Sequence, residues 1–117
     1  QEIEKLLSKV SGIRIPVELE NAETSWFGVP VICDTGKIKR RLVNHLESSG
    51  IQTRNYFAGN ILMHPAYTHI DDYKKYPVAS KVLDQVFFLG CSPNYTDDTL
   101  EHIANVVKTF IEDKKCL

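Results

Sequence analysis

Four stretches of the chain have the hydrophobic spacing of amphipathic helices. In each of them apolar residues recur three or four positions apart, so that they share one face of a helix. The stretches cover residues 3–10, 37–49, 78–86 and 100–111. Residues that typically end or cap helices lie beside them. Gly12 and Gly50 follow the first two stretches. Thr96 and Asp98 can cap the last one, and Glu101 is placed to form a capping box with Asp98.

Strand-like patterns lie between these helices. Apolar and polar residues alternate over Ile13–Leu19, whereas Trp26–Cys33 and Phe87–Leu89 are compact apolar runs. Pro16 and Pro30 lack the N–H group that a sheet ladder needs, so we expect these segments to be edge strands or to leave the sheet at the prolines. No internal repeat or low-complexity linker interrupts the pattern, which predicts one domain of the α+β class.

The longest irregular segment runs over Ile51–Tyr76. It contains four of the five tyrosines and two of the four histidines, and its aromatic content argues against disorder. A stretch of this length without its own period is typical of a functional loop. His64 and His69 stand beside two aspartates there, which would suit a metal ion, but these residues are equally common in polar loops, and we assign no metal site.

Composition narrows the classes of partner. The chain has 117 residues, 43% of them hydrophobic and 25% charged, with a formal net charge of -1. This balance gives no field that would attract nucleic acid or an anionic membrane. The longest apolar runs are far shorter than the roughly 20 residues that a membrane span requires. We therefore expect neither partner.

The cysteines indicate the redox compartment of the protein, and the first residues indicate whether the chain is part of a longer one. Cys33, Cys91 and Cys116 include no C-x-x-C pair, so neither a disulfide framework nor a zinc knuckle is indicated. A reducing cytoplasm fits this usage best. The chain opens at Gln1 without an initiator methionine and passes directly into helical spacing, from which we expect it to be a piece of a longer protein.

A few residues could carry chemistry. Arg54 follows the predicted end of a helix and precedes Gly59 and Asn60. Its guanidinium can donate two hydrogen bonds to an anion, the glycine allows the backbone to approach a ligand closely, and the asparagine adds a side-chain amide. A structural salt bridge explains Arg54 equally well. The basic cluster over 37–41 is either a solvated face or an anion site. His45 and His102 fall inside helices without ligand partners at i+3 or i+4 and are expected on the surface.

The order of several motifs resembles a known family. The run Gly50–Asn60 followed by His64–Tyr67 resembles the "GI.TR..FAGN....PAY" stretch in the small C-terminal domain of the DegT/DnrJ/EryC1/StrS sugar nucleotide aminotransferase family. Ser25–Pro30 resembles the family's "sWFGfP" strand, Tyr76–Ala79 its "fPvA" helix start, and Leu89–Thr96 its closing pattern. The "FAGN" version is similar to that of the nucleotide-sugar 3-dehydrases of lipopolysaccharide dideoxysugar synthesis.

The resemblance implies a fold and a set of partners. The fold would be a two-layer α+β domain, a small sheet covered by helices, belonging to a fold-type I enzyme that depends on pyridoxal phosphate. Residues 1–117 would form its C-terminal small domain, with the cofactor-binding domain and the catalytic base elsewhere. The parent would be a cytoplasmic homodimer acting on a nucleotide sugar with pyridoxal or pyridoxamine phosphate, and this chain alone would bind no cofactor.

The resemblance also implies which residues meet the substrate. The family's Arg and Gly-Asn positions approach it, which points to Arg54 as an anion or hydroxyl contact and to Asn60, beside Gly59, as a polar contact. Gln52 shares a strand face with Arg54 by period two, and His64, just before the "PAY" segment, is a further candidate. No catalytic residue is expected within this chain.

Three functions stay open from the sequence. The first is the small domain of a 3-dehydrase, which removes a 3-hydroxyl from a 4-keto-6-deoxyhexose carried by a nucleotide. The second is the same domain of a sugar nucleotide aminotransferase, which requires a lysine in its large domain to hold the cofactor. The third is a stand-alone module that binds a small anionic ligand or a protein. Because the cofactor's ring supplies the carbanion stabilisation, this chain alone is expected to be catalytically silent.

Overall fold

The computed structural model describes residues 2–114 of the chain. It therefore excludes Cys116, one of the three cysteines. The described part contains four α-helices, four β-strands and two short 3₁₀ helices. The helices are α1 (Glu2–Leu7), α2 (Gly36–Ser48), α3 (Pro77–Gln85), α4 (Asp97–Lys114), η1 (Ile61–Met63) and η2 (Tyr73–Lys75). The strands are β1 (Ile13–Arg14), β2 (Gly28–Cys33), β3 (Thr53–Asn55) and β4 (Val86–Gly90).

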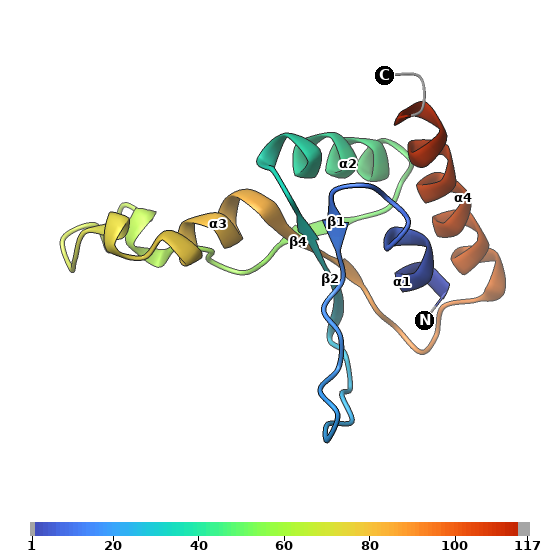
Figure 1. The fold of residues 1–117 in the computed structure, drawn as a ribbon, viewed down its shortest axis with the longest axis horizontal. Coiled ribbons are helices and arrows are strands. Elements are labelled where there is room, and N and C mark those ends of the chain that lie inside the picture. Colours follow the sequence, from blue (N-terminus) through green and yellow to red (C-terminus); the bar gives the residue numbers. More distant parts are fainter. Residues whose placement is uncertain (1, 115–117) are drawn as a thin grey trace.

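The strands form one antiparallel sheet in the order β1-β2-β4-β3. Helices α1, α2 and α4 gather on one side of it (Figure 1). The predicted α+β architecture, a small sheet covered by helices in two layers, is confirmed. The helices over 37–49 and 78–86 and the strand over Phe87–Leu89 are confirmed to within one or two residues.

Two prolines explain why the first strand is so short. The sequence predicts a strand over Ile13–Leu19, but only Ile13 and Arg14 pair with β2. The register Arg14↔Ile32 would bring Pro16 opposite Pro30 two residues further along. Neither proline can donate a ladder hydrogen bond, so the β1–β2 pairing stops and the first segment leaves the sheet before Pro16, as expected there. The expectation is wrong for Pro30, because β2 is an inner strand and stays in the sheet through Pro30, which pairs with Phe88. The alternating segment then projects outward, with Val17 and Leu19 88% and 80% exposed.

Helix ends follow local capping chemistry, with two differences from the sequence pattern. Thr35 caps α2 by accepting a hydrogen bond from the Ile38 N–H, and the positive φ of Gly50 follows its end. Helix α1 ends at Leu7, earlier than its apolar spacing indicates, because the next residues form turns. The capping box of Asp98 with Glu101 is wrong. Thr96 accepts from the Thr99 N–H, which places Asp98 inside the first turn of α4.

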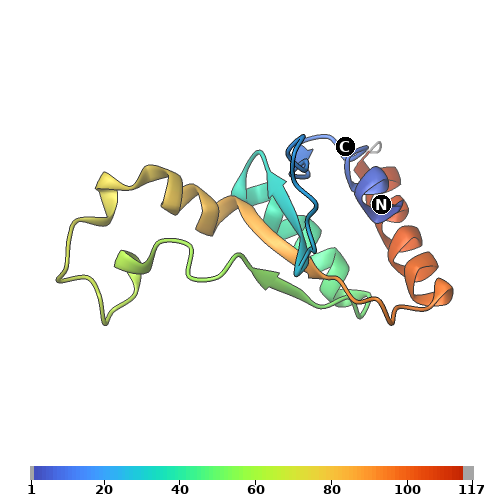
Figure 2. The ribbon, with the colours of Figure 1, turned by 90° about the horizontal axis from the view of Figure 1, so that it is seen from below.

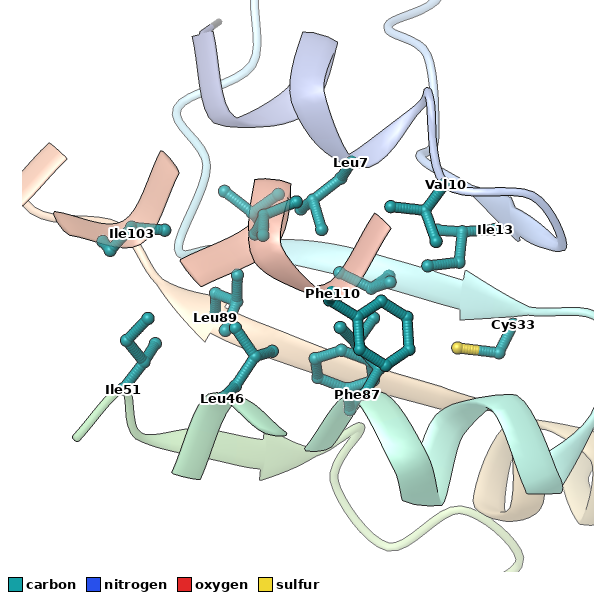
Figure 3. Packing of buried hydrophobic residues seen from close by; sticks show 14 residues of the cluster. Leu7, Val10, Ile13, Cys33, Leu46, Ile51, Phe87, Leu89, Ile103 and Phe110 are labelled. Atoms are coloured by element: carbon teal, nitrogen blue, oxygen red, sulfur yellow. The ribbon is translucent and has the colours of Figure 1, made fainter. Parts of the chain in front are cut away.

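The core lies between the sheet and the three covering helices. Alternate strand residues supply the sheet side of it, and apolar stripes on the helices supply the other side. Figure 3 shows Leu46 of α2 and Phe110 of α4 converging on Phe87 and Leu89 of β4. The fully buried members include Leu7, Leu42, Leu46, Val31, Cys33, Phe87 and Val107.

Two parts of the chain extend beyond this core. One is the segment between β1 and β2, and the other, which we call the arm, covers residues 56–85 with η1, η2 and α3. Figures 1 and 2 both show the arm reaching away from the sheet. The radius of gyration is 15.7 Å, whereas about 13 Å is typical of a compact domain of this length. The arm and the first projection account for the expanded shape.

Candidate functional site

One face of the sheet is left uncovered by α1, α2 and α4. Side chains alternate between the two faces of a strand, and Phe87 and Leu89 of β4 point into the core. Phe88, between them, therefore lies on the opposite face. The register places Pro30 of β2 and Arg54 of β3 on either side of Phe88. We call this surface the open face.

Four aromatic rings gather on the open face. Phe27, Tyr56 and Phe57 surround Phe88, with ring centroids 5.8, 6.4 and 5.9 Å from it, respectively. Phe27 and Phe57 stack on each other although they are 76% and 68% exposed. With Trp26 and neighbouring residues, the rings line a groove of about 160 Å³. Exposed aromatic clusters of this kind are typical of surfaces that bind a partner or a ligand.

A second groove adjoins the aromatic cluster, because Phe88 lines both. Its volume is about 320 Å³, and Gln52 and Arg54 both border it. Polar side chains from the start of α4 and the segment before it complete its wall: Tyr95, Thr99 and His102. The structure thus brings together two of the residues to which the family resemblance points as substrate contacts. Both are exposed.

Arg54 is held by the strand rather than by a strong ion pair. The ion pairs formed by the described residues do not include Arg54. Glu47, at the end of α2, accepts hydrogen bonds from the backbone N–H and the hydroxyl of Thr53 at 2.6 and 2.7 Å. The charge of Arg54 acts on the same carboxylate. The guanidinium therefore keeps its hydrogen-bond donors available to an anionic ligand.

The tie between Glu47 and Thr53 gives a pH-dependent prediction. Hydrogen bonds from the Thr53 hydroxyl and backbone, and then the charge of Arg54, lower the pKa of Glu47. The folded state favours the carboxylate, so this tie stabilises the fold above the unfolded-state pKa. The stabilisation is lost as pH falls through the lower, folded-state pKa.

Carboxyl-carbon NMR of Glu47 checks this. We expect its titration midpoint to lie below that of a model peptide, and Thr53→Val to move the midpoint upward because it removes the side-chain hydrogen bond that lowers the pKa most. A titration midpoint that is the same in Thr53→Val and in the parent would contradict this account. Arg41→Gln, on the exposed side of α2, is the control.

Gly59 and Asn60 lie at the base of the arm. Gly59 has a φ of +61°, and a Cβ atom there would lie 2.5 Å from Cβ of Leu83. The Asn60 side chain is buried. Its oxygen accepts from the Leu62 N–H, and its Nδ2 donates to the carbonyl of Tyr73 and the hydroxyl of Ser80 at 3.2 and 3.0 Å. Both residues thus hold parts of the arm together, and their role as substrate contacts stays a prediction.

His64 also belongs to the arm. Its Nε2 atom lies 3.0 Å from the carbonyl oxygen of Ala58, which turns the exposed ring back toward the segment that carries Gly59. The structure therefore separates the five candidates into two groups. Gln52 and Arg54 border the groove on the open face, whereas Gly59, Asn60 and His64 shape the arm beside it. The contact of His64 with substrate stays a prediction.

Sequence reasoning missed three structural roles. The aromatic cluster unites residues from three segments, and only the clustering of exposed aromatics in the irregular segment hinted at it. Lys39 is buried rather than part of a solvated basic face. His45 and His102 join α2 to α4, because their Nε2 atoms lie 2.9 Å from the carbonyl oxygens of Val106 and Ser49. Helical spacing alone does not show these contacts.

Residues 2–114 contain neither a metal-binding cluster nor a membrane-spanning helix. No group of three or more histidine, cysteine, aspartate or glutamate side chains in this part could hold a metal ion. Asp71, near His69 in sequence, instead accepts from Nζ of Lys75 and the hydroxyl of Tyr76. No described helix is both long and apolar enough to cross a membrane.

Comparison with known proteins identifies the family. The family model described as the DegT/DnrJ/EryC1/StrS aminotransferase family matches residues 1–108. The chain belongs to this family. The match covers the open face, both grooves and the arm. The family membership expected from the ordered motifs is thus confirmed.

Curated relatives within the family include 3-dehydratases. The chain is 33% identical over 113 residues to dTDP-4-dehydro-2,6-dideoxy-D-glucose 3-dehydratase of Saccharopolyspora spinosa, covering 90% of this chain and 24% of the relative. It is 28% identical over 106 residues to the lipopolysaccharide biosynthesis protein RfbH of Salmonella typhimurium, covering 84% and 23%. The chain thus spans about a quarter of the length of these relatives.

Solved structures share the fold. The structure of DesV from S. venezuelae in complex with a ketimine intermediate matches with a TM-score of 0.81 and 22% identity, over 95% of this chain and 29% of that one. GDP-4-keto-6-deoxy-D-mannose-3-dehydratase of E. coli with bound hydrated PLP matches with a TM-score of 0.69 and 23% identity, over 91% and 28%. These likenesses establish that the chain has the fold of one part of such enzymes.

Proposed function

We propose that residues 1–117 are the C-terminal small domain of a nucleotide-sugar 3-dehydrase. The whole protein would remove the 3-hydroxyl of a 4-keto-6-deoxyhexose carried by a nucleotide, in the synthesis of lipopolysaccharide dideoxysugars. The observation that carries this proposal is the 33% identity, over nine-tenths of the chain, to a relative named as a 3-dehydratase. The chain's likeness to the lipopolysaccharide biosynthesis protein RfbH supports the same pathway.

The shape of the molecule supports its being one part of a larger enzyme. Its radius of gyration of 15.7 Å exceeds the value of a compact domain, and the arm exposes apolar side chains that a free-standing domain would normally cover. These include Ile61, Ile70 and Val78, which are 50–73% exposed. A cofactor-binding domain and a second subunit would cover such surfaces. The parent is accordingly proposed to be a cytoplasmic homodimer.

We further propose that residues 2–114 would not form a pyridoxal phosphate site by themselves. Such a site needs a lysine that is free to react, or another base, beside a cradle for the phosphate. Lys39 is the buried lysine among the described residues, and its Nζ atom is bound to the carbonyl of Leu83. The cofactor, whose ring supplies the electron sink for this chemistry, would therefore be held by the rest of the parent protein.

The contribution of this chain would be to bind and orient the substrate. Arg54 would contact an anionic or hydroxyl group of the nucleotide sugar, and Gln52, on the same groove, would add a second polar contact. The rings of Phe27 and Phe57 would supply an apolar surface that excludes water from one side of the bound molecule. Asn60 and His64 would approach the substrate only from the base of the arm.

A sugar nucleotide aminotransferase is the second candidate. The description of the matching family model as an aminotransferase family favours it. A stand-alone binding module is the third candidate. It would be monodisperse and would not bind dyes that report exposed apolar surface, whereas a domain cut from a larger enzyme would self-associate or bind them.

Trapping the cofactor separates the two enzymes. We expect the natural gene product, incubated with pyridoxal phosphate and reduced with borohydride, to bind the cofactor without forming a labelled lysine detectable by mass spectrometry. A known sugar aminotransferase treated in parallel is the control for trapping. A labelled lysine would demote the dehydrase in favour of the aminotransferase. A gene product of about 13 kDa that binds no cofactor would overturn both.

A further inference from the structure

Lys39 joins the arm to the body of the domain. It belongs to the basic cluster at the start of α2, but it is 8% exposed, whereas Lys37, Arg40 and Arg41 are exposed. Its Nζ atom donates to the carbonyl oxygen of Leu83 at 2.7 Å. Leu83 lies in the last turn of α3, the helix through which the arm returns to the sheet. The contact therefore links α2 to the arm.

The carbonyl that Lys39 binds has no partner in the helix ladder. The last four carbonyls of an α-helix lack intrahelical donors, and in α3 the N–H of Val86 ends the ladder at the carbonyl of Val82. The ammonium of Lys39 satisfies the next carbonyl and places a positive charge at the negative end of the helix. Burial lowers the pKa of Lys39, and the nearby Asp84 carboxylate partly opposes this.

The rest of the arm is tied to the same helix. Gly59 packs directly on Leu83, and the amide of Asn60 donates to Ser80 in the second turn of α3 and to Tyr73 of η2. The position of α3 therefore sets the position of the chain segment just before Gly59. That segment carries Tyr56 and Phe57, two rings of the aromatic cluster.

We propose that Lys39 is a positioning residue, which fixes α3 against α2 and thereby holds Tyr56 and Phe57 on the open face beside the substrate groove. It acts through the arm and does not itself touch the substrate. The inference rests on the proposed function for its kinetic consequence only. The mechanical part, that Lys39 fixes the arm, is independent of which reaction the parent catalyses.

Lys39→Met tests the mechanical part, because methionine retains the apolar stem and loses the donor. In the natural gene product we expect amide hydrogen exchange in residues 59–83 to accelerate about tenfold, with exchange in β2 and β4 unchanged. Lys39→Arg, which can still donate to the Leu83 carbonyl, should restore slow exchange. Arg40→Gln is the matched control, since its ion pair with Asp84 is exposed and 3.5 Å long.

Kinetics on a nucleotide-sugar substrate test the consequence. We expect Lys39→Met to raise KM several-fold with kcat within about twofold of the parent, because the substrate surface moves while the reacting groups stay in place. Faster exchange with an unchanged KM, or unchanged exchange in the arm, would overturn the inference. A parent that turns over no nucleotide sugar would refute the proposed function instead, and the exchange data would still decide whether Lys39 fixes the arm.

Discussion

Arg54→Gln in the natural gene product is expected to lower kcat/KM for a nucleotide sugar about 100-fold, because an anionic substrate group would lose its charged, bidentate partner. Arg54 lies in the middle of β3, opposite Phe88, and borders the larger groove of the open face. It is exposed and takes part in no ion pair among those of residues 2–114. Steady-state kinetics measures the effect.

Two further variants show whether the guanidinium itself is responsible. Arg54→Lys keeps the charge but loses the planar pair of hydrogen-bond donors. We therefore expect its kcat/KM to lie between the values of the parent and of Arg54→Gln. Arg41→Gln removes an exposed arginine from α2 and should leave kcat/KM unchanged. If Arg54→Gln and Arg41→Gln have the same kcat/KM, Arg54 is not a substrate contact, and the proposal that this groove binds the substrate loses its main support.

Gly59→Ala is expected to destabilise the fold by about 2–4 kcal/mol, from overpacking and from a left-handed backbone that alanine disfavours. The new Cβ atom would lie 2.5 Å from Cβ and 2.9 Å from Cα of Leu83, at a φ of +61°. The second of these atoms belongs to the backbone of α3, so the helix itself would have to shift. Denaturant unfolding of parent and variant measures the difference.

Gly50→Ala separates the two causes. Gly50 has a φ of +79°, yet, apart from its two chain neighbours, no atom of the described residues lies within 4 Å of the place that its Cβ would occupy. Its substitution therefore carries only the backbone penalty, about 1–2 kcal/mol. The excess loss in Gly59→Ala reports the contact with Leu83. Equal losses in the two variants would show that α3 yields easily and that the arm is not tightly fixed.

The Gly59–Asn60 pair serves the fold, and its role at a substrate site stays a prediction. The resemblance to the family points to these residues as part of the substrate surface. In the structure the glycine allows α3 to approach the base of the arm, and the amide of the asparagine holds η1, η2 and α3 together. Any approach to substrate would follow from this architecture, since the Asn60 side chain is 2% exposed.

The sequence alone determined the elements whose causes are local. Helical spacing between Thr35 and Gly50 defined α2, the run Phe87–Leu89 defined the centre of β4, and the ordered motifs established the family. Pro16 marked where the first segment leaves the sheet, although only the register revealed that it would lie opposite Pro30, which itself stays paired in β2. Periodicity, caps and ladder donors depend on neighbours a few residues away, so a sequence can report them.

Only the tertiary structure decided which distant residues meet. Phe27, Phe57 and Phe88 form one cluster because three strands bring them to the same face. Lys39 is buried because the end of α3, 44 positions further along, presents a carbonyl to it. The direction of the arm follows from that contact and from Gly59. Such pairings depend on how whole elements pack in space, and the spacing of residues along the chain does not show this packing.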